Sequence, residues 1–215
     1  MNCITEIVFI LDRSGSMAGL ESDTIGGFNA MIEKQRRLEG DALVSTILFD
    51  SESEVLHDRI KLDRVPKMTD REYSVGGCTA LLDAVGGAIQ HIKNIHKYAR
   101  REDIPAKTMF VITTDGMENA SRRCDYESVR RLIEAQKKAG WEFLFLGANI
   151  DAAAEAKRFG IDEAHAANYN CDKAGTALNY EVLCDAITTV RSGASLKKNW
   201  KARIDKDYNE RGIKR

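Results

Sequence analysis

The sequence predicts an α/β fold in which helices cover both faces of an open, mostly parallel sheet. Strand-like and helix-like segments alternate along most of the 215 residues, which is the pattern of βαβ units with right-handed crossovers. The predicted strands are short and mostly apolar, as is typical of strands buried on both faces. Only four polar residues, 50–53, join two of them. A link this short fits a hairpin, so we expect one antiparallel edge strand.

The first half of the chain is predicted to contain three strands and one helix. Residues 4–11 are a short apolar run of the kind that forms a buried strand. Mostly apolar side chains at helical spacing then mark one face of a helix that ends at Gly40, namely Phe28, Met31, Ile32, Gln35 and Leu38. Residues 42–49 and 54–62 are the two strands that the short link joins.

The second half alternates helices with strands. A loop over 63–78 precedes residues 79–99, where apolar side chains repeat at steps of three and four and predict a long amphipathic helix. Residues 109–114 are a central strand. The remaining predicted elements are, in order, a helix over 129–136 that ends near Gly140, a strand over 141–146, a short helix over 150–159, a strand over 165–169 and a helix over 178–189.

The composition argues against several classes of protein. The net charge of −1 provides no general attraction to nucleic acid, and no apolar run reaches the roughly 18 residues of a membrane span. Glu6 and Asp12 interrupt the first apolar run, which also lacks a basic leader, so we expect no signal peptide. The five cysteines include no Cys-x-x-Cys pair. We therefore expect free thiols and a cytoplasmic location.

The C-terminal segment differs in charge from the rest of the chain. Residues 195–215 hold eight Lys and Arg against three Asp and Glu, a net charge of +5. Apolar side chains follow one another at steps of four along one helical stripe, namely Leu196, Trp200, Ile204 and Tyr208. We divide the chain into a domain over 1–192 and a basic amphipathic helix or tail over 193–215. A helix packed on the domain is the favoured interpretation, and the alternatives are a docking helix for a partner or for an anionic surface.

Oxygen-bearing side chains follow the first predicted strand at every second position, as Asp12, Ser14 and Ser16. Alternate side chains of an extended segment point the same way, so these three can converge beyond the strand, where open α/β sheets bind ligands. Asp115 ends a later strand, and Thr79 follows a Gly-Gly-Cys segment before a predicted helix. Oxygen-only ligands suit a hard cation such as Mg²⁺, which takes about six oxygens.

Together these motifs resemble the von Willebrand factor type A domain. Asp-x-Ser-x-Ser follows the first strand, a Thr follows a glycine-rich loop, and Thr-Asp-Gly follows a later strand. The resemblance covers roughly residues 4–190 and implies a Rossmann-like sheet with one antiparallel edge strand. It also implies a metal-ion-dependent adhesion site for Mg²⁺ or Mn²⁺, made by Asp12, Ser14, Ser16, Thr79 and Asp115.

The resemblance further implies how such a site would work. Ser14, Ser16 and, in one state, Thr79 would bind the ion directly, whereas Asp12 and Asp115 would act largely through waters. Hydroxyls bring no formal charge, so the ion stays electrophilic and keeps an open position. The implied partner is a protein that presents an Asp or Glu to that position.

Two other functions remain open at this point. A metal flanked by aspartates can support phosphoryl transfer, which makes a metal-dependent hydrolase the alternative from another class. The chain has no phosphate loop, nucleophile elbow or Gly-x-Gly-x-x-Gly fingerprint, and Ser14 stands where an Asp-x-Asp phosphotransferase needs a carboxylate. None of the four histidines is close in sequence to a site segment. We expect a metal-dependent adaptor that is not an enzyme; a subunit in which the metal only stabilises the fold is the third candidate.

Overall fold

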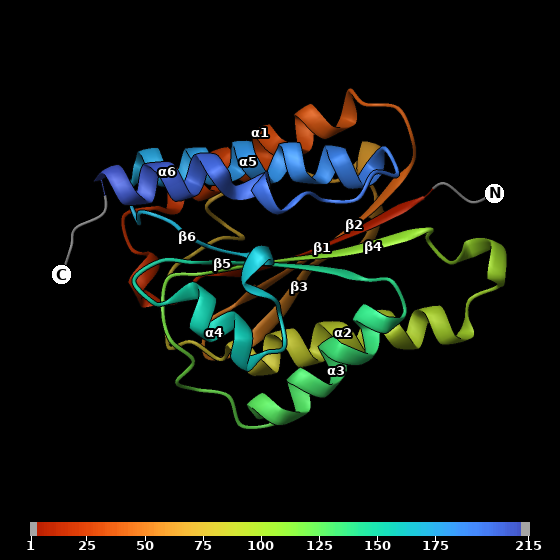
Figure 1. Cartoon of the computed structure of the whole chain (residues 1–215), viewed down its shortest axis with the longest axis horizontal. Helices are drawn as coiled ribbons and strands as arrows, with labels where there is room; N and C mark the ends of the chain where they lie inside the picture. The colour runs from red at the N-terminus through yellow and green to blue at the C-terminus, as the bar shows by residue number, and fades with distance from the viewer. Residues whose placement is uncertain (1–3, 212–215) are drawn as a thin grey trace.

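The computed structural model describes residues 4–211 and shows a six-stranded sheet between two layers of helices (Figure 1). The strand order is β3-β2-β1-β4-β5-β6, and every neighbouring pair is parallel except β2 and β3. The open, mostly parallel α/β sheet with one antiparallel edge strand is therefore confirmed. The strands are β1 (Thr5–Asp12), β2 (Ala42–Phe49), β3 (Ser53–Lys61), β4 (Lys107–Thr114), β5 (Glu142–Gly147) and β6 (Ala166–Asn168).

Helices lie on both faces of the sheet, with α1, α5 and α6 on one face and α2, α3 and α4 on the other (Figure 1). An apolar cluster fills the space on each face, and the side chains of β1 alternate between them. Phe9 packs with the first group of helices, whereas Val8 and Ile10 pack with the second. The helices are α1 (Glu21–Arg36), α2 (Leu81–Tyr98), α3 (Tyr126–Lys138), α4 (Ala152–Arg158), α5 (Lys173–Arg191) and α6 (Ala202–Arg211). Within residues 4–211, none of them has the length and apolar character that crossing a membrane requires.

The last strand is shorter than the sequence predicts. Instead of covering 165–169, β6 is limited to Ala166–Asn168, because Glu163–His165 form a 3₁₀ turn just before it. β6 pairs only with Phe145, Leu146 and Gly147 of β5. The first half of β5 consequently has no strand along its outer side.

The C-terminal segment packs on the domain through apolar side chains. Ile204 of α6 is buried, and Leu196 and Trp200 lie against the same apolar cluster as α1 and α5. The indole N–H of Trp200 donates a 2.8 Å hydrogen bond to the carbonyl oxygen of Ala164, just before β6. The apolar stripe of the segment therefore packs against the domain.

Many of the basic side chains of this segment are also bonded to the domain. Arg203 pairs with Glu181 of α5 at 2.6 Å, and Arg211 pairs with Asp172 at 2.7 Å. The Nζ of Lys201 donates to the backbone carbonyls of Glu163, in the turn before β6, and of Ala166, the first residue of β6. Much of the positive charge of the segment is therefore balanced within the fold, which weakens the interpretation of α6 as a docking helix for an anionic surface.

Candidate metal centre

The carboxylate of Asp12 joins three pieces of chain at the carboxyl edge of the sheet. β1 and β4 are adjacent and parallel, so Asp12 at the end of β1 lies beside Thr114 and Asp115. The hydroxyl of Thr114 donates to Asp12 Oδ2 at 2.7 Å, and the N–H of Asp115 donates to the same oxygen at 3.2 Å. The N–H of Ser14 donates to Oδ1 at 2.7 Å. Asp12 is 1% exposed. Its carboxylate holds the loop after β1 against the end of β4.

The three predicted hydroxyls come together above this carboxylate. Ser14 precedes a 3₁₀ turn over Gly15–Met17, which brings the hydroxyl oxygen of Ser16 to 3.2 Å from that of Ser14. A Cβ placed on Gly116 would lie 3.5 Å from Thr79 Oγ1 and 3.6 Å from Ser16 Oγ. The loops after β1 and β4 and the loop before α2 therefore meet at one place, and Ser16 is its exposed member.

The loop that carries Thr79 is bonded to both of its neighbours. The N–H of Thr79 donates to the side-chain oxygen of Asn119 at 2.8 Å, and the N–H of Asn119 donates back to the carbonyl of Thr79 at 3.0 Å. On the other side, the N–H of Gly15 donates to the carbonyl of Gly77 at 3.2 Å. The helix predicted to begin at Thr79 begins two residues later, because Ala80 has a ψ of 57° and lies outside the helical region. Thr79 is thereby left in the loop.

Asp115 is held by two residues outside the five predicted ones, Asn149 and Cys171. The side-chain amide of Asn149 donates to its Oδ1, and the thiol of Cys171 hydrogen-bonds to the same carboxylate. Burial raises the pKa of Asp115; the hydrogen bonds from Cys171 and Asn149 oppose this rise, and the nearby Asp12 adds to it. The centre therefore holds two buried carboxylates that repel each other.

A signal for both missed residues was present in the sequence. Asn149 follows β5 by two residues, and Cys171 follows β6 by three. In an open parallel sheet, side chains just past the carboxyl ends of the strands share one edge. The rule that identified the segments after β1 and β4 would have found Asn149 and Cys171 if it had been applied to β5 and β6.

The donor set of the centre fits a hard divalent cation. All five predicted residues lie together, and they offer three hydroxyls and two carboxylates, which are the oxygen ligands that Mg²⁺ and Mn²⁺ accept. Within the described residues, no group of three or more His, Cys, Asp or Glu side chains forms an alternative metal site. Among those residues, the hydrogen-bond partners of Asp12 are backbone N–H groups and the Thr114 hydroxyl. Buried carboxylates are normally paired with a cation or bind a metal, so the centre is chemically suited to a bound cation.

This chain is similar in structure to solved proteins, whereas its sequence matches no known family. No protein-family model matches the sequence, and no curated protein matches it either. The chain superposes on the von Willebrand domain of the type V pilus tip protein Mfa5 from Porphyromonas gingivalis with a TM-score of 0.59, at 13% identity, over 90% of this chain and 98% of that one.

Two further solved structures give the same result. A von Willebrand factor type A protein from Catenulispora acidiphila matches with a TM-score of 0.58 at 14% identity, over 85% of this chain and 42% of that one. Proximal thread matrix protein 1 from the mussel byssus, solved with zinc in its metal-ion-dependent adhesion site, matches with a TM-score of 0.56 at 14% identity, over 85% of this chain and 46% of that one. This chain thus spans a little less than half the length of each of these two proteins. At these identities the likeness concerns the fold alone: residues 4–211 have the open α/β architecture of von Willebrand factor type A domains.

Proposed function

We propose that this chain is a protein-binding domain that holds Mg²⁺ or Mn²⁺ with Asp12, Ser14, Ser16, Thr79 and Asp115 and binds an acidic side chain of a partner protein. The observation that carries the proposal is the pair of buried carboxylates, Asp12 and Asp115, which lie together without an ion-pair partner among residues 4–211. A buried negative pair of this kind is costly unless a cation compensates it. The hydroxyls of the three remaining residues surround the place where that cation would sit.

Each residue of the centre has a distinct task under this proposal. Ser14, Ser16 and Thr79 present uncharged oxygens from two loops whose positions are set by backbone hydrogen bonds. Asp12 fixes those loops to β4, because its two oxygens accept three hydrogen bonds. Asp115 is oriented by Asn149 and Cys171. When bound, the divalent ion supplies an electrophilic position for the carboxylate of the partner.

The surroundings of the centre suit a protein partner. Met117, two residues after Asp115, is 59% exposed, which is unusual for a large apolar side chain and provides a contact for an apolar group of a partner. The side chains of the next two residues are already hydrogen-bonded within the domain. Glu118 accepts hydrogen bonds from the N–H groups of Leu82 and Ser121, and Asn119 holds Thr79.

A hydrolase at the same centre has less support. The four histidines have their nearest polar or charged neighbours elsewhere: His57 contacts Thr46, His91 contacts Asp58, and His96 contacts Glu6, while Asp162 lies near His165. Within residues 4–211, none of these contacts involves a residue of the centre, so no imidazole is placed there as a general base. The third candidate, a metal that only stabilises the fold, is separated from ours by the experiment below.

Metal binding is tested by calorimetry of the full chain with MgCl₂ and MnCl₂. We expect binding by the native protein, at least a ten-fold loss of affinity in Asp12→Ala, and unchanged affinity in Asp70→Ala, which removes an exposed carboxylate from the loop before α2. Absence of Mg²⁺ and Mn²⁺ binding by the native chain would refute the proposal.

Partner binding needs a second measurement. Proteins captured by the native chain in Mg²⁺ should be absent in chelator and absent with Asp12→Ala, and replacing one Asp or Glu of the identified partner by Ala should abolish capture. If metal binds but capture is the same with and without chelator, the ion has only a structural role.

The proposal includes a reducing compartment, and therefore the cytoplasm. Cys78, Cys124, Cys171 and Cys184 are free thiols in the structure, and Cys3 lies outside the described residues. All five thiols should react with a thiol reagent in denatured, unreduced protein. A titre of three or one would show disulfides and contradict this part of the proposal.

A further inference from the structure

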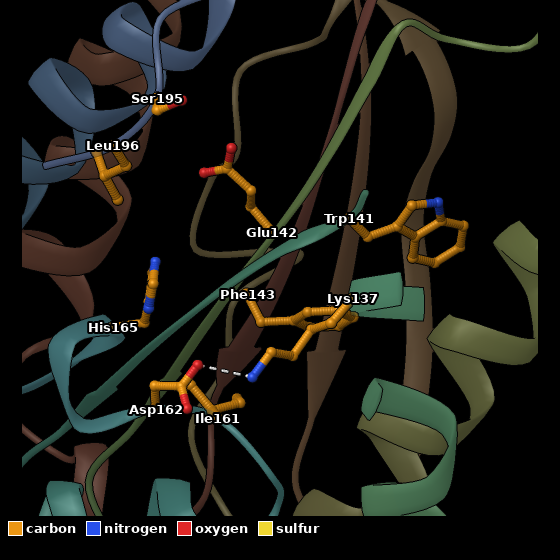
Figure 2. A pocket seen from close by; sticks show the side chains of 9 residues that line it. All are labelled: Lys137, Trp141, Glu142, Phe143, Ile161, Asp162, His165, Ser195 and Leu196. Carbon is orange, nitrogen blue, oxygen red and sulfur yellow. Dashed lines mark hydrogen bonds and ion pairs between the residues drawn. The ribbon is translucent and has the colours of Figure 1, made fainter. Parts of the chain in front are cut away.

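A cavity of about 270 Å³ lies at the opposite end of the sheet from the candidate metal centre (Figure 2). It forms where β6 leaves the first half of β5 uncovered. Its walls come from separate parts of the chain: Lys137 of α3, Glu142 of β5, Asp162 and His165 of the turn before β6, and Leu196 of the segment before α6.

Glu142 brings to this cavity a buried polar atom that lacks a partner. Its Oε2 atom is buried and has no hydrogen-bond partner among the described residues. Figure 2 shows its carboxylate on the side of the cavity that faces Ser195 and Leu196, away from Lys137. A buried carboxylate oxygen without a donor is costly, and such groups in folded proteins call for a partner. Glu142 as a whole is half-buried and lines the cavity, so a cation in the cavity can pair with its carboxylate.

The cationic side chains nearby are already occupied. The Nζ of Lys137 donates to the carbonyl of Gly160 at 3.0 Å and forms a 2.7 Å ion pair with Asp162 (Figure 2). Lys201 donates to the backbone carbonyls of Glu163 and Ala166. Neither lysine is therefore free to neutralise Glu142.

His165 adds no positive charge to the cavity at neutral pH. Burial lowers the pKa of its imidazole below the ordinary value of 6.5; Asp162 and Glu142 oppose this shift, and the two nearby lysines reinforce it. Lys137 and Asp162 cancel each other's formal charge, so the lining as a whole carries a single negative charge, that of Glu142. An anion would be repelled by this carboxylate, whereas a cation would be attracted.

We propose that this cavity binds an organic cation, a primary ammonium or guanidinium group, that pairs with the carboxylate of Glu142. The aliphatic part of the ligand would lie against Leu196, on the side of the cavity that the Glu142 carboxylate faces (Figure 2). A volume of about 270 Å³ lies near the lower limit for small-molecule sites, which suits a small amine or a single side chain. The same chemistry is offered by a free amine and by a Lys or Arg side chain of another protein.

The test uses calorimetry with the full chain and four probes: agmatine, n-butylammonium, butyrate and inorganic phosphate. We expect saturable binding of the two cations and none of the two anions. Glu142→Gln, which keeps the shape and removes the charge, should weaken cation binding about ten-fold or more. Glu163→Gln is the matched control, because Glu163 is exposed and does not line this cavity.

A stability measurement separates a ligand-binding role of Glu142 from a structural one. Without ligand, Glu142→Gln should not lower the melting temperature, since it removes the charge of a half-buried carboxylate whose Oε2 atom has no donor. A drop in melting temperature would indicate that Glu142 supports the fold and would count against the proposal. Tighter binding of butyrate or phosphate than of agmatine, or no binding of any probe, would overturn it.

Two further measurements identify the source of the cation and keep this site distinct from the metal centre. Binding of a blocked Gly-Arg-Gly peptide as tightly as agmatine would indicate a protein side chain, and preference for agmatine would indicate a free amine. Asp12→Ala should bind both cations normally, because Asp12 ends β1 at the opposite edge of the sheet. Failure of the metal proposal would therefore leave this one standing, and the reverse also holds.

Discussion

The hydroxyl of Thr114 donates a 2.7 Å hydrogen bond to Oδ2 of Asp12 and so joins the ends of two neighbouring parallel strands at the candidate metal centre. Both side chains are buried, at 0% and 1% exposure. In the sequence, Thr114 is recognisable only as part of an apolar strand and of a Thr-Asp-Gly turn. In the structure, it orients the carboxylate on which the centre is built.

Thr114→Val should lower the affinity for Mn²⁺ about ten-fold, because residues that orient metal ligands typically contribute at that level. It should also reduce the free energy of unfolding by about 1–3 kcal/mol, since a buried charge-assisted hydrogen bond is lost. Thr113→Val is the matched control on the neighbouring position of β4 and should leave Mn²⁺ affinity unchanged. Calorimetry and urea denaturation measure the two effects, and equal Mn²⁺ affinity in both variants would contradict the role assigned to Thr114.

Asn149 combines a contact to Asp115 with a left-handed backbone, at a φ of 56°. Replacing it by Gly and by Ala separates the two properties, because only glycine adopts positive φ without steric cost. Both variants should bind Mn²⁺ more weakly than the native chain, by similar factors. Both variants lose the hydrogen bond to Asp115, and Asn149→Ala should be less stable than Asn149→Gly by about a further 1 kcal/mol. If the two variants differ in Mn²⁺ affinity as much as in stability, the backbone of Asn149 matters to the centre more than its amide.

The packing of α1 on α5 leaves no room for a side chain at Gly27. A Cβ there would lie 2.2 Å from Cδ2 of Tyr180, whereas a Cβ on the preceding Gly26 would meet no atom within 4 Å. Gly27→Ala should therefore destabilise the fold by about 1–3 kcal/mol. Gly26→Ala should stabilise it by about 0.5–1 kcal/mol, because alanine is the better helix former. Denaturation of the two variants side by side checks this, and a stable Gly27→Ala variant would mean that α1 and α5 can move apart.

His57 makes the stability of the fold depend on pH. Its ring is buried on β3, stacks on Phe28 at 6.2 Å between ring centroids, and has Nδ1 3.0 Å from the hydroxyl of Thr46. Burial lowers the pKa of His57, with Glu72 opposing the shift. The unfolded chain therefore takes up a proton below about pH 6.5 that the native chain resists, and this contribution to stability is lost as pH falls.

His57→Gln should thus lose less stability than the native protein between pH 7.5 and pH 5.5. The pKa of His165 is also lowered by burial, and because His165 remains in the variant, part of the pH dependence should persist. Urea denaturation at several pH values measures the difference. A variant with the same pH dependence as the native chain would show that His57 is readily protonated in the fold.

The order of elements and the candidate centre could be predicted from the sequence because both depend on local patterns. Apolar runs and helical spacing identify β1, β2, β4 and α2, and the four-residue link at 50–53 is too short for anything but a hairpin. Asp12, Ser14 and Ser16 were found for the same reason, since alternation along an extended segment is a property of a few neighbouring residues.

The polar partners of these residues depend instead on strand order, which brings together segments far apart in the chain. Glu6 interrupts an apolar strand in the sequence, yet in the fold it is fully buried and pairs with Arg59 of β3 at 2.5 Å and with His96 of α2 at 2.6 Å. The contacts of Asn149 and Cys171 with Asp115 have the same origin. A residue's own neighbours in sequence can indicate the edge of the sheet at which it lies, as for Asn149 and Cys171. They do not indicate which residue it contacts, because the distance between the partners is set by packing of the whole sheet.

The cavity beside Glu142 illustrates the same division. The sequence predicts a strand over 165–169 that would have paired along more of β5, but the turn at Glu163–His165 and the packing of Leu196 and Trp200 leave β6 only three residues long. Local β-propensity identifies the strand, whereas its length is set by competition between backbone pairing and the packing of distant side chains. In the register of the sheet, a strand that began at His165 would reach only Leu144. The opening beside Glu142 therefore follows from the strand register and not from any pattern around Glu142 itself.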